Sequence, residues 1–290
     1  MNKLSRRQFL GKSALGIGSV FMVSRIPLDL NAGAVPEPVK MPLGFQVWTV
    51  KDQLVKDFPG TLKMVAQMGY QSVEMCSPPG YESSGFGPLM NMKAKEMKQI
   101  INDAGLILTS CHYGMDELRK HLEERIDFAK EAGQNQMILS SFGLPKEATK
   151  SDYLKAADEL NAFGLKTKVS GIQMGYHNHN MEFENKFDDT LLYEILMKEL
   201  DPSYVKMQFQ VAVITDGYKA STYFTKYPGR FISAHLSDWT ADKKEVPIGK
   251  GIVNWKEFFE TLKKGGVQNI FVEMGQETFK ESASYIHSLL

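Results

Sequence analysis

Residues 104–112 read Ala104-Gly105-Leu106-Ile107-Leu108-Thr109-Ser110-Cys111-His112: the end of a helical pattern, a glycine, and an apolar strand that finishes on polar side chains. Glycine just after a helix adopts the left-handed conformation without a Cβ clash, so this order is typical of a helix that leads directly into a strand. The pattern recurs at Met68-Gly69-Tyr70, Ala132-Gly133-Gln134, Ser170-Gly171-Ile172 and Gly265-Gly266-Val267, and prolines mark two further junctions at Pro202 and Pro228. Strands that alternate with helices predict βα units and a parallel sheet.

Eight such strands can be counted. They are expected near Gly44–Thr49, Gln71–Met75, Ile107–His112, Met137–Ser140, Ile172–His177, Tyr204–Val211, Phe231–Leu236 and Ile270–Glu273. Eight βα units close most simply into an α/β fold of the (β/α)8 TIM-barrel type, a single domain over residues 43–290. A doubly wound sheet is the weaker alternative, because no glycine-rich phosphate fingerprint follows the first strand. Asn254 to Glu257 has the form of a capping box that opens the seventh helix.

The first 34 residues are predicted to be a signal peptide rather than part of the fold. Arg6 and Arg7 precede Phe9-Leu10, a short apolar run spans residues 14–23, and Ala32-Gly33-Ala34 forms an A-x-A cleavage site. The paired arginines resemble a twin-arginine signal. Residues 35–42 are then a linker, and we expect an exported, periplasmic protein.

Bulk composition excludes several classes of function. The 290-residue chain has a formal net charge of zero, so nothing indicates a nucleic-acid partner. No apolar run reaches the roughly 20 residues that a membrane span needs, so stable membrane insertion is not expected. The two cysteines, Cys76 and Cys111, do not make a disulfide scaffold; strand alternation points Cys76 inward and Cys111 outward. A homo-oligomer is left open.

Polar side chains gather where the predicted strands end. Side chains alternate between the two faces of a strand, so His177 and His179 share one face, as do Gln208 and Gln210. Burying several such groups without partners would be costly, so one shared site at the C-terminal mouth explains them better. Two long loops, Ser77 to Asn91 and Ser237 to Val253, follow strands on this side, and their aromatic residues favour ordered lids.

One motif carries a family resemblance. Tyr176-His177-Asn178-His179-Asn180-Met181-Glu182-Phe183 resembles the Y-H-N-H-x-x-E-F motif of the xylose-isomerase-like barrels, which include sugar isomerases and epimerases. Tyr227-Pro228-Gly229-Arg230, His235-Leu236-Ser237-Asp238, Gly249-Lys250-Gly251 and Phe271-Val272-Glu273 follow in the family's order. The resemblance runs from about Gly44 to the C-terminus.

The resemblance implies a divalent metal at the mouth of the barrel. Family ligands come from strands five to eight, typically Glu, Asp, His and Glu, and they fall here on His177, Gln210, His235 and Glu273. His177 and Gln210 replace carboxylates, so two negative charges are lost. Mn²⁺ or Mg²⁺ should then bind less tightly, and Zn²⁺ or Co²⁺ would tolerate the imidazoles better.

The remaining site residues are assigned by position. Glu273, His179 and Glu74 are the candidate catalytic groups, and Glu273 is the only carboxylate left at the four ligand positions. The candidate substrate-binding residues are Gln46, Trp48, His112, Asn178 and Gln208.

These residues predict an enzyme that takes a proton from the carbon next to a sugar carbonyl, with assistance from a metal. Isomerisation and epimerisation share this step, and so does β-elimination by a keto-glycoside lyase. Export and the missing phosphate loop favour an unphosphorylated carbohydrate. A sugar-binding barrel without turnover is the alternative from a different class.

Overall fold

The computed structural model describes residues 41–290. The predicted signal peptide and all but the last two residues of the predicted linker lie outside the described residues. From residue 41 onward the chain forms one compact unit.

Eight parallel strands close into a barrel, which confirms the predicted fold class. Around the barrel they follow the order β1-β12-β9-β8-β5-β4-β3-β2, and β1 pairs with β2 to complete the ring. The strands are β1 (Leu43–Gln46), β2 (Ser72–Cys76), β3 (Ile107–Tyr113), β4 (Gln136–Leu139), β5 (Gln173–His177), β8 (Val205–Gln210), β9 (Phe231–Leu236) and β12 (Asn269–Val272).

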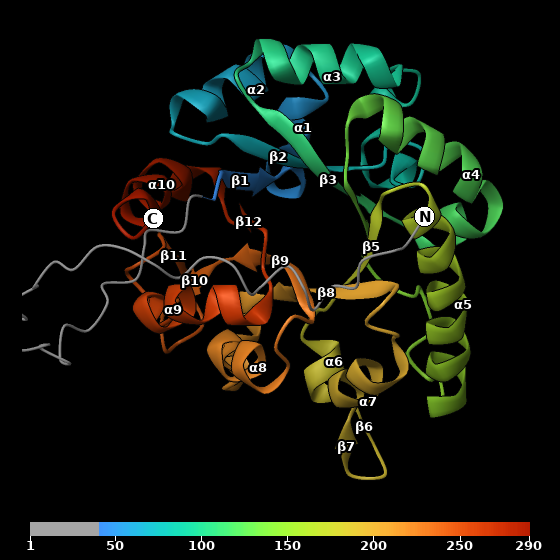
Figure 1. Cartoon of the computed structure of the whole chain (residues 1–290). Coiled ribbons are helices and arrows are strands. Elements are labelled where there is room, and N and C mark those ends of the chain that lie inside the picture. Colours follow the sequence, from blue (N-terminus) through green and yellow to red (C-terminus); the bar gives the residue numbers. More distant parts are fainter. Residues whose placement is uncertain (1–40) are drawn as a thin grey trace, which may run out of the picture. The chain divides into compact units, whose positions relative to one another are not determined.

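Helices form the outer layer of the molecule, as Figure 1 shows for α3, α4 and α5. They are α1 (Lys51–Leu54), α2 (Phe58–Gln67), α3 (Ala94–Asp103), α4 (Met115–Ala132), α5 (Lys150–Val169), α6 (Met181–Glu184), α7 (Leu192–Glu199), α8 (Ala220–Lys226), α9 (Trp255–Gly265) and α10 (Phe279–His287). Gly133 shows how a helix passes into a strand: at φ 85° it ends α4, and its N–H points back to the carbonyls of Ala129 and Lys130. The residues described include no helix long and apolar enough to cross a membrane.

Seven of the predicted strands are placed to within about one residue, and the first is wrong at its end. β1 ends at Gln46, and Val47–Val50 forms a 3-10 turn instead of continuing the strand. The Gln46 side chain accepts a hydrogen bond from the Trp48 N–H at 2.6 Å, which starts that turn. The Gln46 side chain therefore competes successfully with the backbone hydrogen bonds of the sheet.

Two short hairpins were not predicted. β6 (Lys186–Phe187) pairs with β7 (Thr190–Leu191), and β10 (Asp238–Trp239) pairs with β11 (Glu245–Val246) inside the second predicted loop. Two-residue strands carry no readable alternation. That loop is organised by Asp238, whose carboxylate accepts hydrogen bonds from the N–H groups of Gly249, Gly251 and Val253 and from the Trp255 indole.

The predicted capping box at α9 is only half correct. Asn254 accepts a hydrogen bond from the Glu257 N–H, as expected of an N-cap. The Glu257 side chain does not return to Asn254, because it accepts a hydrogen bond from the Ser221 hydroxyl at 2.7 Å. A complete box, unpredicted, opens α5 at Thr149 and Asp152.

Candidate functional site at the barrel mouth

A cavity of about 430 Å³ opens at the C-terminal ends of the strands. Trp48, 37% exposed, stands at its rim with Tyr81 and Trp239. Other residues of its wall are Gln46, Cys76, His112, Ser140, His177, His179, Gln210 and Glu273. Six of these eight were predicted site residues, so the strand ends do converge on one cavity.

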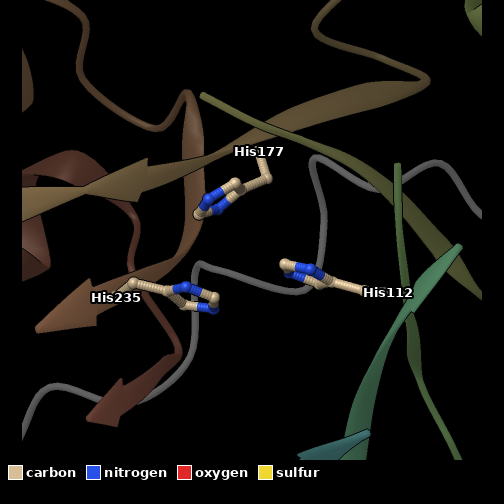
Figure 2. A group of neighbouring side chains, drawn as sticks. All are labelled: His112, His177 and His235. Atoms are coloured by element: carbon tan, nitrogen blue, oxygen red, sulfur yellow. The ribbon is translucent and has the colours of Figure 1, made fainter. Parts of the chain in front are cut away.

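Three buried imidazoles cluster at the site; His112 and His177 line the cavity, and His235 does not. His112, His177 and His235 come from β3, β5 and β9, and Figure 2 shows their rings turned toward one another. One nitrogen of each ring lies within 4.8 Å of the others. The rings of His112 and His235 stack with their centroids 5.1 Å apart. Strand alternation therefore gathers three ligand-type side chains from separate strands.

Glu74 lies under this cluster and has no exposed surface. Its carboxylate accepts hydrogen bonds from Ser110 Oγ at 2.6 Å and from Gln208 Nε2 at 2.8 Å, and it also contacts the Nε2 atoms of His235 and His112. Burial alone raises the pKa of Glu74, but the nearby His112 and His235 outweigh burial and lower it. Glu74 is therefore a fixed anion that holds the imidazoles, and it does not line the cavity.

The Gln208 side chain sets the orientation of two imidazoles. Its Nε2 donates to Glu74 and to Ser233 Oγ at 2.9 Å, so its Oε1 must be the acceptor on the other side. That oxygen lies 2.7 Å from His112 Nε2 and 2.9 Å from His177 Nδ1. Each ring therefore directs an N–H at Gln208 and keeps the lone pair of its other nitrogen. Gln208 is fully buried, which suits holding the rings rather than contacting a ligand.

His235 connects two carboxylates. Its Nδ1 lies 2.9 Å from Glu273 Oε2, and its Nε2 contacts Glu74 Oε2. Burial on its own lowers the pKa of His235, but Glu273 and Glu74 outweigh burial and raise it to about 10. Burial and the neighbouring histidines hold the pKa of His177 well below its usual range, so that ring is neutral.

Glu273 is the carboxylate that reaches the cavity, with 18% of its side chain exposed. Its Oε2 accepts hydrogen bonds from His235 and, at 2.7 Å, from Gln210 Nε2. Within residues 41–290 its Oε1 receives no side-chain hydrogen bond. Burial raises the pKa of Glu273, but the positive charge on His235 outweighs burial, so the net shift is downward.

The structure separates the predicted site residues into two layers. Gln46, Trp48, His112, His177, His179, Gln210 and Glu273 line the cavity, whereas Glu74, Asn178, Gln208 and His235 do not. Asn178 is fully buried and accepts the Gln210 N–H at 3.1 Å. The Gln210 amide is engaged by Glu273 and by the Ala212 N–H.

Sequence reasoning missed several supporting residues. Ser110 and Ser233 lie two residues before His112 and His235, on the same face of β3 and β9, so alternation could have identified them. Tyr81 donates a hydrogen bond to Ser140 Oγ at 2.6 Å across the cavity wall. Tyr81 was expected in a lid, but its contact with the end of β4 had no signal in the sequence.

The chain belongs to the xylose isomerase-like TIM barrel family, whose family model matches residues 62–289. A search of curated proteins gave no match.

Similar solved structures support the same fold. A sugar phosphate isomerase/epimerase from Parabacteroides distasonis aligns with a TM-score of 0.72 and 24% identity, over 89% of this chain and 97% of that one. A xylose isomerase-like TIM barrel protein from Mycobacterium smegmatis in complex with magnesium aligns with a TM-score of 0.63 and 14% identity, over 86% and 96% of the chains. A probable 3-DHS dehydratase from Bacillus anthracis aligns with a TM-score of 0.65 and 11% identity, over 85% and 99%.

Proposed function

We propose that the protein is an enzyme that removes a proton from the carbon next to a sugar carbonyl and thereby isomerises or epimerises the sugar. The observation that carries this proposal is the partly exposed Glu273 carboxylate in the wall of the mouth cavity, hydrogen-bonded to one of three clustered, buried imidazoles. A sugar phosphate isomerase/epimerase of the same fold supports the reaction type.

The imidazole cluster fits a divalent cation. His112 and His177 would hold it, because Gln208 leaves each of them with a free lone pair and the buried Glu74 supplies negative charge. His235 would join them only after losing a ring proton, because both of its nitrogens contact carboxylates. A nitrogen-rich donor set suits Zn²⁺, Co²⁺ or Ni²⁺ better than Mg²⁺, which prefers oxygen ligands. When bound, such an ion would polarise the carbonyl oxygen of the sugar. The expected ligand Gln210 would instead orient Glu273.

Glu273 would act as the base through its free Oε1. It would take the proton from the carbon, and the electron pair would form the enediolate. In isomerisation Glu273 would return the proton to the neighbouring carbon, whereas in epimerisation a second group would protonate the original carbon from the opposite face. The lowered pKa of Glu273 makes it a weak base, so a second group is useful. His179 lies in the same wall, and its ring centroid is 4.8 Å from that of His177.

One observation favours the elimination reaction as a second candidate function. A neighbouring cavity of about 540 Å³ shares Tyr81, Ser140 and Ser141 with the mouth. That space could hold the leaving group of a keto-glycoside. After the same proton abstraction, the glycosidic C–O bond breaks and the abstracted proton passes to the departing alcohol.

Solvent exchange tests the proposal directly. We expect the purified protein to incorporate deuterium from D₂O at the carbon next to the carbonyl of a free ketose or aldose, and a keto-glycoside to be cleaved if elimination operates. Chelation should abolish the exchange, and added Zn²⁺ or Co²⁺ should restore it. Saturable sugar binding with no exchange would instead identify a binding protein.

A further inference from the structure

We propose a second binding site, outside the barrel, for a small carboxylic acid with an apolar ring or short chain. A cavity of about 260 Å³ lies between the outer face of β2 and β3 and the helices α3 and α4. Met75 and Cys111 line it, whereas their neighbours Cys76 and His112 line the mouth. The two cavities are therefore separated by the thickness of the barrel wall.

The apolar part of the wall of this outer cavity is adaptable. It includes Met75, Leu89, Met90, Met92, Met97 and Phe128. Methionine is unbranched and polarisable, so it adjusts to ligands of irregular shape. An apolar cavity of about 150 Å³ holds benzene, so about 260 Å³ has room for a ring with a short polar arm.

One buried polar group in the wall lacks a partner. Gln134 is 4% exposed, and its Oε1 accepts the Tyr113 hydroxyl at 2.9 Å. Its Nε2 is therefore the free end of the amide, and it has no hydrogen-bond partner among the described residues. A buried donor without a partner is destabilising. A ligand oxygen would remove that cost.

The charges around the outer cavity favour a carboxylate over an ammonium group. Among the described residues that line it, Lys93 and Arg125 are cationic and Glu131 is acidic, and Glu131 pairs with Lys95 at 3.3 Å. Arg125 itself pairs with Glu117 at 3.0 Å. The first residue of α3, Ala94, also lines the cavity, and its N-cap residue Lys93 makes no side-chain capping bond. The positive end of that helix adds to the preference for an anion.

Phenylacetate is the probe, titrated into the full-length protein by calorimetry and ligand-observed NMR. We expect saturable one-to-one binding that Gln134→Leu weakens about tenfold or more, through loss of the hydrogen bond to the charged group. Gln136→Leu is the matched control, because Gln136 is equally buried in β4 but does not line the cavity. Ala94→Leu should abolish binding by filling the cavity.

The same titrations can overturn the proposal. Unchanged binding in both Gln134→Leu and Ala94→Leu would place phenylacetate elsewhere. No saturable binding of phenylacetate or hexanoate at millimolar concentration would mean that the cavity holds only water. If Ala94→Leu shows no cooperative unfolding transition in a thermal melt, the effect of Gln134→Leu on phenylacetate binding decides the proposal. Glu273→Gln should leave phenylacetate binding unchanged, so this result is independent of the proposed activity.

Discussion

Glu273 combines exposure to the cavity with an anchored second oxygen, which is the arrangement a positioned base requires. Glu273→Gln keeps the size of the side chain and removes the base. We predict that kcat falls about 10²–10⁴-fold with little change in KM, because positioned proton transfer contributes about that factor. Steady-state kinetics on the substrate identified by deuterium exchange measures both constants. Full turnover in Glu273→Gln with none in His179→Ala would move the base to His179.

Gln208 is predicted to matter through the histidines rather than through the substrate. Gln208→Leu removes the acceptor shared by His112 and His177 and a donor to Glu74. Metal affinity should fall about 10–100-fold, the usual effect of losing a group that orients ligands. Competition with a chelating indicator measures it. Ser233→Ala, which removes a partner of Gln208 that touches no imidazole, should have a smaller effect, and equal effects would contradict this role.

The sequence was enough to predict which residues face the site, but not the role that each of them has. Period-two alternation identified the side chains that face the mouth, because a strand leaves only two choices. Depth could not be predicted this way: Glu74 and Gln208 point inward like His112, yet they lie below the cavity. How far along the axis each strand extends depends on the barrel register, which is a property of the paired strands.

At the scale of elements, Gly164 in α5 sets how closely that helix packs on the barrel. A Cβ at Gly164 would lie 2.8 Å from the carbonyl oxygen of Tyr204, a backbone atom that cannot turn aside. Alanine favours a helix by about 1 kcal/mol over glycine, but overpacking costs about 1–3 kcal/mol. We therefore predict that Gly164→Ala is net destabilising in chemical denaturation.

A matched change on the exposed side of the same helix isolates the propensity effect. Ala162→Gly, at an exposed position, should cost about 1 kcal/mol from helix propensity alone. A more stable Gly164→Ala protein would show that α5 can shift outward freely.

Elements with long periodic patterns were predictable, and those fixed by single contacts were not. The strand from Phe231 to Leu236 was placed correctly because six apolar-rich residues lie between clear boundaries. The end of β1 depended on one Gln46 hydrogen bond, and the hairpin of β10 and β11 depends on the carboxylate of Asp238. Such contacts join residues whose proximity exists only after folding.

At the scale of the whole molecule, Glu182 should make stability depend on pH. Burial raises the pKa of Glu182 to about 7, although hydrogen bonds from Tyr176 and the His179 N–H oppose the shift. Between pH 4.5 and 7 the folded protein then holds a proton that the unfolded chain has released. Stability therefore falls as pH rises through this window, by at most about 3 kcal/mol for this group.

Denaturation at several pH values checks this dependence. Glu182→Gln should flatten the slope between pH 5 and 8, because the side chain no longer titrates. Glu184→Gln, at an exposed position in the same helix, should leave the slope unchanged. The same slope in all three proteins would assign the dependence to other groups.

Export concerns the part of the chain before the barrel. Arg6→Lys combined with Arg7→Lys is predicted to leave the protein in the cytoplasm, because the twin-arginine pathway reads that pair. Cell fractionation with an antibody measures the distribution. Periplasmic accumulation of the double variant would refute the pathway assignment.

Closure of the barrel has a consequence for assembly. Every one of the eight strands is paired on both sides, so the barrel offers no free edge to which another chain could add a strand. Over residues 41–290 the remaining edges belong to the two-residue ribbons β6–β7 and β10–β11. A homo-oligomer of this protein would therefore have to associate through its helices and loops. An assembly that is extended by adding strands of further chains to a sheet would find only these short edges.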